Sequence, residues 1–325
     1  MLCIGAFCVE RRICLLETVV STALSVDENM TIKKNRLAPK ELSGKEKRIC
    51  IVTGTHGDEI EGQYVCYELI RRVNANMGNL AGIVDVYPAL NPLGIDAISR
   101  SVPLFDLDMN RIFPGSETGA MAEHVAHMVV NDIMGADLCI DIHSSDVFLR
   151  EIPQVRVAPE NSVKLMKYAK MLNTDFIWVA DSSAVRPSSL SCTMNELGVP
   201  TVVVEMGVGM RITKSYGEQL LDGIFAVMAN MGIWTGETKP VSNPMVSTDG
   251  VVTVIHAENN GVFMPAVKHW MGITKGEHIG DIVNPFTGEI EEEIFSQVSG
   301  MVFTLREYPI VTTGSLIARI LGGAR

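Results

Sequence analysis

Two histidines and a glutamate have the residue types and the spacing of a metal site. His56 and Glu59 lie three residues apart where an apolar segment gives way to a helical pattern, so both side chains face one side of the first helical turn. His143 ends another apolar segment, DLCIDIH. Two His and one Glu are a common ligand set for catalytic zinc, with the fourth position left to water. A His-x-x-Asp/Glu pair arises about once by chance in this composition, and a His at a strand end can also be purely structural.

A further carboxylate, Glu205, ends the apolar segment TVVVE and is followed by Met206 and Gly207. Burying a carboxylate is costly unless it is paired, bound to a metal or functional. Glu205 is therefore a candidate general base that takes a proton from a metal-bound water, with a pKa raised by burial. The alternative is a structural carboxylate that accepts hydrogen bonds from neighbouring loop amides.

Cationic and amide side chains are concentrated in one loop that contains Arg100, Asn110 and Arg111. Arginine grips a carboxylate through two parallel hydrogen bonds, so an Asn-Arg pair is a suitable carboxylate clamp and a separate Arg can stabilise an oxyanion. The alternative is a solvated loop in which these arginines pair with Asp106 and Asp108. The remaining histidines receive no role, because His124 and His127 share a helix without a third ligand and the other three lack metal-ligand spacing; these are His256, His269 and His278.

Alternating strand and helix patterns position these residues. The predicted strands are 49–54, 83–90, 136–143, 176–180 and 201–205, and the predicted helices begin near 58, 120, 163, 190 and 216. Such alternation predicts an α/β fold with a mostly parallel sheet and helices on both faces. Ligands of such sheets bind at the carboxyl ends of the strands. The candidate residues follow four of these strand ends, and that convergence is stronger evidence for a site than any short motif.

Further segments extend this unit at both ends. Residues 18–37 alternate loosely and predict one or two edge strands, and 1–17 are interpreted as a peripheral extension. A polar, Pro-containing linker at 235–244 separates the α/β domain, 18–240, from short Gly-punctuated strand patterns in 245–325. The sequence therefore predicts a second, small all-β domain of ordinary size.

Composition excludes several classes of partner. The chain has 325 residues with a formal net charge of −11 and no basic tract, so neither nucleic acid nor an anionic membrane is an expected partner. Seven cysteines without a CxxC pair indicate a reducing compartment, and we expect a cytoplasmic protein. The first residues lack the cationic region of a signal peptide, and no apolar segment is long enough for a membrane span.

The spaced set of motifs resembles the succinylglutamate desuccinylase/aspartoacylase family, relatives of the zinc carboxypeptidases, over most of the chain. The resemblance rests on Gly54-Thr55-His56-Gly57-Asp58-Glu59, Asn91-Pro92 with Arg100, Asp108-Met109-Asn110-Arg111-Ile112-Phe113-Pro114-Gly115, Asp141-Ile142-His143 and Val204-Glu205-Met206-Gly207.

By position, this resemblance implies that one zinc ion is bound by His56, Glu59 and His143 and that Glu205 acts as general base and then acid. It also implies that Arg100 polarises the scissile carbonyl and that Asn110 and Arg111 hold a substrate carboxylate. The C-terminal domain is then a lipoyl-like sandwich that partly covers the active site, although no Met-Lys-Met tripeptide marks a modified lysine.

The sequence thus predicts a zinc-dependent amidohydrolase that deacylates a small, anionic N-acylated amino acid or a related acylated amine. Two alternatives stay open: a zinc carboxypeptidase acting on peptides, and a non-catalytic small-ligand binding protein with a relic metal site. Neither the acyl group, the amine nor the oligomeric state follows from the sequence.

Overall fold

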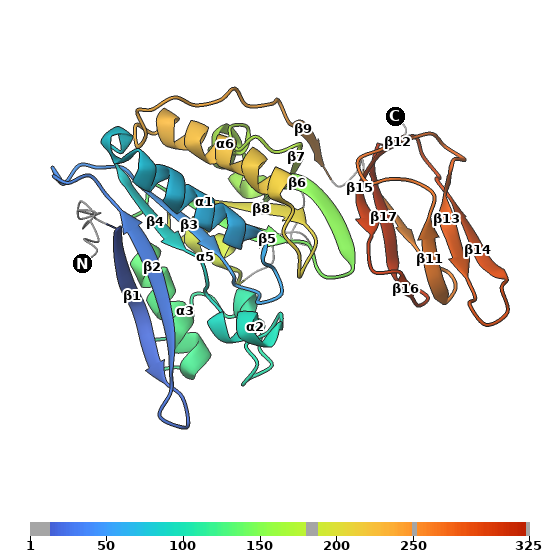
Figure 1. Cartoon of the computed structure of the whole chain (residues 1–325), viewed down its shortest axis with the longest axis horizontal. Coiled ribbons are helices and arrows are strands. Elements are labelled where there is room, and N and C mark those ends of the chain that lie inside the picture. The colour runs from blue at the N-terminus through green and yellow to red at the C-terminus, as the bar shows by residue number, and fades with distance from the viewer. Residues whose placement is uncertain (1–13, 180–187, 249–251, 323–325) are drawn as a thin grey trace, which may run out of the picture.

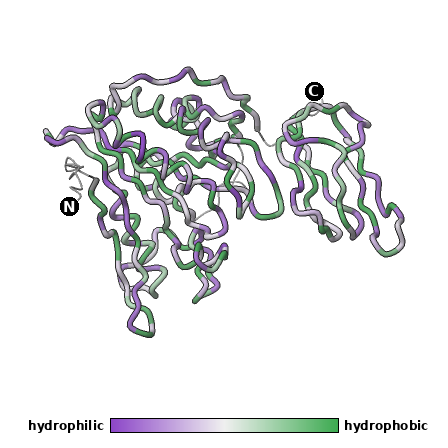
Figure 2. The backbone as a smooth tube through the Cα atoms, in the orientation of Figure 1, coloured by the Kyte–Doolittle hydropathy of each residue, from purple (hydrophilic) through white to green (hydrophobic). Residues whose placement is uncertain are grey.

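Four parallel strands form the centre of the molecule in a computed structural model that describes residues 14–179, 188–248 and 252–322. Their order in the sheet is β4-β3-β5-β8 (Figure 1). The strands are β3 (Arg48–Thr53), β4 (Ile83–Tyr87), β5 (Leu138–Ser144) and β8 (Thr201–Gly207). Figure 2 shows apolar residues along these strands, as expected where a sheet is covered on both faces. All four strands occupy segments that the sequence predicts.

Helices cover both faces of this centre. Along β3, Ile49 and Ile51 pack into the core beneath one set of helices, and Cys50 and Val52 pack into the core beneath the other. The first set is α1 (Glu61–Ala75), α4 (Ser162–Ala169) and α6 (Lys214–Asn230), and the second is α3 (Met121–Ile133) and α5 (Leu190–Glu196). The predicted two-faced α/β layout is confirmed. Short helical segments complete the connections: α2 (Pro92–Ala97), η1 (Met77–Asn79), η2 (Met109–Arg111) and η3 (Pro159–Asn161).

The sheet is mixed outside its centre, which corrects the expectation of a mostly parallel sheet. On one side, β1 (Cys14–Ala23) and β2 (Asn29–Leu37) form an antiparallel hairpin whose second strand runs antiparallel to β4. On the other side, β6 (Leu149–Val157) runs antiparallel to β8, and β7 (Phe176–Val179) and β9 (Met245–Thr248) follow in parallel. The sequence pattern did not predict β6, because Pro153 and three charged residues interrupt it.

Several predicted boundaries differ from the structure. β1 begins at Cys14, so the last four residues of the predicted extension belong to a strand, and residues 1–13 lie outside the described chain. The helix predicted to begin near 58 begins at Glu61, and the strand predicted at 83–90 ends at Tyr87. Residue 180 of the strand predicted at 176–180 lies outside the described chain.

The C-terminal segment is built of antiparallel strands in two layers around its own apolar core. The strands are β10 (Val252–His256), β11 (Gly261–Pro265), β12 (Gly272–Ile273), β13 (His278–Val283), β14 (Ile290–Phe295), β15 (Gly300–Arg306), β16 (Ile310–Val311) and β17 (Leu316–Leu321). No helix occurs among the described residues of this lobe, as predicted. One of its layers continues the main sheet, because β15 pairs with β6. Its likeness to a lipoyl domain stays a prediction.

Within the described parts of the chain, no helix is both long and apolar enough to cross a bilayer.

Candidate metal centre and active site

The loop after β3 carries His56 and Glu59 and is held in place by its glycines. Gly54 has a φ of +69°, which an L side chain rarely adopts. A Cβ at Gly57 would lie 1.9 Å from the carbonyl carbon of Gly94 in α2, so only glycine allows the loop to pack there. Asn91 fixes α2 in turn, since its side chain caps the helix by accepting a hydrogen bond from the Gly94 amide at 2.9 Å. These contacts place the loop at the carboxyl end of the sheet.

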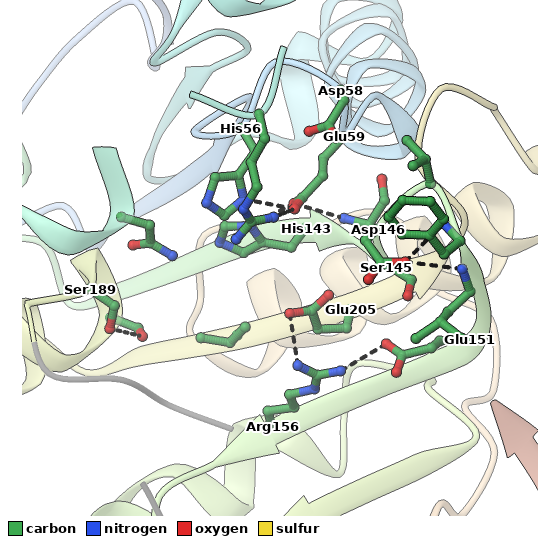
Figure 3. A pocket seen from close by; sticks show the side chains of 18 of the residues that line it. His56, Asp58, Glu59, His143, Ser145, Asp146, Glu151, Arg156, Ser189 and Glu205 are labelled. Carbon is green, nitrogen blue, oxygen red and sulfur yellow. Dashed lines mark hydrogen bonds and ion pairs between the residues drawn. The ribbon is translucent and has the colours of Figure 1, made fainter. Parts of the chain in front are cut away.

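The three predicted metal ligands converge. One potential ligand atom from each of His56, Glu59 and His143 lies within 4.8 Å of the others, and all three residues are buried. Nδ1 of His56 is 2.7 Å from Oε1 of Glu59, and Nδ1 of His143 is 2.8 Å from Oε2 of the same carboxylate. Figure 3 shows the three side chains meeting above β5 and β8. The predicted proximity is confirmed.

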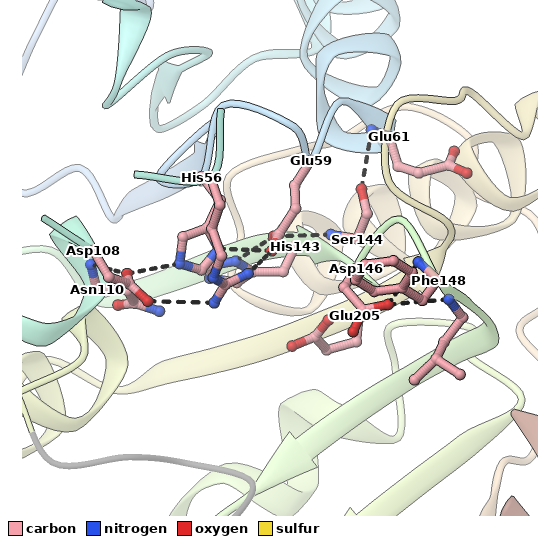
Figure 4. Close-up of polar contacts among 12 residues, drawn as sticks. His56, Glu59, Glu61, Asp108, Asn110, His143, Ser144, Asp146, Phe148 and Glu205 are labelled. Carbon is pink, nitrogen blue, oxygen red and sulfur yellow. Dashed lines mark hydrogen bonds and ion pairs between the residues drawn. The ribbon is translucent and has the colours of Figure 1, made fainter. Parts of the chain in front are cut away.

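Two further carboxylates hold the outer nitrogens of these imidazoles. Oδ1 of Asp108 is 3.0 Å from Nε2 of His56, and Oδ2 of Asp141 is 3.1 Å from Nε2 of His143 (Figure 4 draws the first contact). Metal-bound imidazoles commonly donate their second N–H to such a carboxylate, which fixes the ring and its tautomer. Asp141 is not among the site residues predicted from the sequence, although its position two residues before His143 places both side chains on one face of β5.

The residues present fit a divalent cation. Three carboxylates, those of Glu59, Asp108 and Asp141, surround two imidazoles, and Nδ1 of both rings faces the buried Glu59 carboxylate. Although burial disfavours a charged ring, Asp141 and Glu59 raise the pKa of His143 well above its usual value. The carboxylates thus favour positive charge at this position, and a metal cation bound to neutral imidazoles would supply that charge in place of protons on the rings.

Glu205 lies on β8 beside this cluster and is directly opposite His143 in the parallel register. Burial raises the pKa of Glu205 to about 7, against the opposing effect of Arg156. Its carboxylate Oε1 is 3.2 Å from Nη1 of Arg156. Among the described residues, this arginine is its polar partner rather than the loop amides that the structural alternative required.

The loop residues lie at the same site. Nη1 of Arg100 is 2.8 Å from Oε1 of Glu59, and its Nη2 is 3.4 Å from Oδ2 of Asp108. Nη2 of Arg111 lies 3.8 Å from the same oxygen of Asp108. The salt bridges of the structural alternative therefore exist with Asp108, yet both guanidinium groups remain partly exposed, at 40% and 35%. Asn110 accepts a hydrogen bond from the amide of Leu190 at 2.9 Å, which ties the loop to the start of α5.

A cavity of about 570 Å³ connects all these groups. Its lining includes every predicted site residue: His56, Glu59, Arg100, Asn110, Arg111, His143 and Glu205. It also includes Glu151 and Arg156 of β6 and Arg319 of β17, which sequence reasoning missed. A C-terminal strand thus reaches the cavity wall through Arg319.

The other histidines lie apart from this cluster. His124 Nδ1 contacts the carbonyl oxygen of Glu117, and His127 Nε2 contacts the side chain of Asn131. Neither belongs to a group of potential metal ligands in the described chain, which agrees with their interpretation as helix-face residues.

Residues 45–231 match the model of the succinylglutamate desuccinylase/aspartoacylase catalytic domain. The chain is similar to the N-alpha-acetyl-L-2,4-diaminobutyric acid deacetylase of Halomonas elongata, with 23% identity over 288 residues that cover 85% of this chain and 82% of that protein.

Two solved structures share the fold. The product-bound ectoine utilization protein EutE (DoeB) from Ruegeria pomeroyi has a TM-score of 0.78 and 21% identity, covering 96% of this chain and 94% of that one. A succinylglutamate desuccinylase from Silicibacter sp. TM1040 has a TM-score of 0.79 and 21% identity, covering 94% and 93%. Since the family model spans more than half of the residues, the chain belongs to the succinylglutamate desuccinylase/aspartoacylase family.

Proposed function

We propose that this protein is a zinc-dependent deacylase that hydrolyses the amide bond of a small N-acylated amino acid or a related acylated amine. The observation that carries the proposal is the buried group of His56, Glu59 and His143 in one cavity with Glu205. These three side chains would hold the metal, as in other sites with two His and one Glu. Bound there, zinc supplies a Lewis acid that polarises a carbonyl oxygen and lowers the pKa of water.

Glu205 moves the proton in this proposal. Its carboxylate accepts a proton from the attacking water and then delivers that proton to the amine that leaves. A pKa of about 7 suits both steps, because the group is neither too weak a base nor too weak an acid near neutral pH. The carboxylate is 15% exposed and lines the cavity, where an attacking water and a substrate can reach it.

The loop residues bind and orient the substrate. Arg100, which touches Glu59 and has an exposed edge, is placed to stabilise the negative charge that develops on the carbonyl oxygen. Arg111 and the amide nitrogen of Asn110 would hold the substrate carboxylate. The Leu190 amide occupies the side-chain oxygen of Asn110, which leaves its NH₂ group to donate.

The size of the cavity and the relatives favour a small substrate. About 570 Å³ falls in the range of small-molecule pockets. The similar Halomonas protein is a deacetylase of N-alpha-acetyl-L-2,4-diaminobutyric acid, a small acylated amino acid. A peptidase acting on long chains is therefore the less favoured alternative.

The test is a substrate panel on purified, zinc-loaded protein. We expect amine release from at least one N-acyl amino acid, little from peptides, and a loss of about 10²- to 10⁴-fold in Glu205→Gln with zinc content retained. Glu293→Gln, an exposed glutamate of β14, is the matched control and should leave activity unchanged. Preferred cleavage of peptides would support the carboxypeptidase, and a metal-bound protein inert toward the whole panel would support the relic binding protein.

A further inference from the structure

Four charged side chains form a continuous chain from the C-terminal lobe to Glu205. Nη1 of Arg319, on β17, is 2.5 Å from Oε1 of Glu151. Oε2 of Glu151 is 2.8 Å from Nη2 of Arg156, whose Nη1 is 3.2 Å from Oε1 of Glu205. Figure 3 shows Arg156 lying between the two carboxylates. Positive and negative groups therefore alternate along the whole chain.

An irregularity in β6 makes this arrangement possible. Glu151 and Arg156 are five residues apart, which in a regular strand places their side chains on opposite faces of the sheet. The pairing of β6 with β8 shifts by one residue between Glu151 and Gln154, so Glu151 lies opposite Gly207 and Arg156 lies opposite Val203. A bulge of this kind re-aims side chains and is common beside active sites. Both residues consequently share the face that carries Glu205.

Glu151, in the middle of this chain, is buried, and the chain is supported from the C-terminal lobe. Glu151 is 1% exposed, so its charge requires full pairing, which two arginines and the hydroxyl of Thr304 at 3.3 Å provide. The guanidinium carbons of Arg156 and Arg319 lie 5.6 and 5.7 Å from the ring centroid of Trp178. The ring of Trp178 packs against both guanidinium groups and limits their movement. Arg319 and Thr304 belong to C-terminal strands, so this lobe helps to form the site.

We propose that Arg156, Glu151 and Arg319 are positioning residues that hold the Glu205 carboxylate in its working orientation. The inference rests on the proposed function of Glu205. A general base must lie within hydrogen-bond reach of the proton that it removes, and small displacements reduce the rate strongly. Arg156 holds one oxygen of Glu205, Glu151 fixes Arg156 through its other nitrogen, and Arg319 fixes Glu151. The competing arrangement is direct binding of the substrate by Arg156 and Arg319.

Steady-state kinetics with a double-mutant comparison separates these arrangements. We expect Arg156→Met to lower kcat about 10- to 100-fold with KM changed less than about threefold, and Arg319→Met and Glu151→Gln to lower kcat about 3- to 10-fold. Arg156→Lys should recover only part of the lost kcat, because lysine keeps the positive charge but its one ammonium group cannot bridge both carboxylates. In a Glu205→Gln background, Arg156→Met should lower the residual rate less than about twofold. If Arg156→Met lowered the residual rate of Glu205→Gln as much as it lowers kcat of the parent protein, the proposal would be overturned. A rise in KM in place of the fall in kcat in Arg156→Met would overturn it as well.

A matched control and a readout without substrate complete the test. Glu307→Gln breaks another ion pair between β6 and the C-terminal lobe, that of Arg150 and Glu307 at 2.9 Å. Neither of these residues lines the cavity, so this variant should leave kcat unchanged. Crystal structures of the zinc-loaded variants should show the Glu205 carboxylate displaced or split between conformers in Arg156→Met and unmoved in Glu307→Gln. An ordered, unmoved Glu205 in Arg156→Met refutes the positioning role. This readout stands even if the panel of N-acyl substrates fails.

Discussion

Replacing Asp141 tests how far the carboxylate behind His143 controls metal affinity. Asp141 is fully buried, and its Oδ2 lies 3.1 Å from the outer nitrogen of His143. Carboxylates in this position typically contribute 10- to 100-fold to metal affinity. Asparagine keeps an oxygen beside the ring but loses the charge, so we expect Asp141→Asn to weaken zinc binding about tenfold, or about 1.4 kcal/mol. Alanine removes the acceptor as well, and Asp141→Ala should approach 100-fold.

The assay is a competition titration with a chromophoric zinc chelator at fixed pH. Asp281→Asn is the matched control, because Asp281 forms a similar pair with Nε2 of His278, at 2.7 Å, away from the metal ligands. That variant should bind zinc like the parent protein. Unchanged affinity in both Asp141 variants, or an equal loss in Asp281→Asn, would refute the reasoning that Asp141 acts through His143.

Three further predictions concern the same site. In the metal-free protein, His56, His143 and Glu205 have raised pKa values and therefore bind protons more tightly in the folded state than in the unfolded state. The Tm of the metal-free protein should therefore fall as the pH rises from about 6 to 8, and bound zinc should reduce that fall. A metal-free Tm that rises over this interval would contradict the prediction. Gly57→Ala places a Cβ 1.9 Å from the Gly94 backbone, so it should lower the free energy of unfolding, measured with denaturant, by about 1–3 kcal/mol or more and should also weaken zinc binding. Gly78→Ala, whose Cβ would meet open space, should change neither quantity. Arg100→Met should retain zinc while kcat falls about 10²- to 10³-fold, and a change confined to KM would assign Arg100 to ground-state binding instead.

The convergence of His56, Glu59 and His143 could be predicted because it depends on a short-range pattern and on one general property of parallel sheets. His56 and Glu59 lie three residues apart in the loop between β3 and α1, and His143 and Glu205 stand at the carboxyl ends of adjacent parallel strands, which brings all four to one edge. The central strands were equally predictable, since their side chains are buried on both faces and form continuous apolar runs.

The far wall of the cavity could not be predicted for physical reasons. Glu151 and Arg156 share a face only because β6 contains a bulge, and the strand itself is obscured by Pro153 and its charged residues. Arg319 is more than 160 residues from Glu151 in sequence, and only the pairing of β15 with β6 brings its strand to the site. No local pattern encodes that pairing.

The cavity lining carries charged side chains of both signs. The chain carries a formal charge of −11, yet four arginines line the cavity: Arg100, Arg111, Arg156 and Arg319. Those on β6 and β17 are matched by buried Glu151, whereas those of the loop are partly exposed. In the proposed function, these partly exposed loop arginines are the cations that meet the substrate carboxylate.

The most direct test of the central claim is a titration of metal-free protein with zinc while deacylation of an accepted N-acyl amino acid is measured. Activity should rise linearly with added zinc and stop rising at one equivalent of zinc per chain. Glu59→Gln should show no such rise at the same concentrations, because it removes the carboxylate that contacts both imidazoles and would bind the metal with them. Full activity in the metal-free protein, or an unchanged break at one equivalent in Glu59→Gln, would contradict the account.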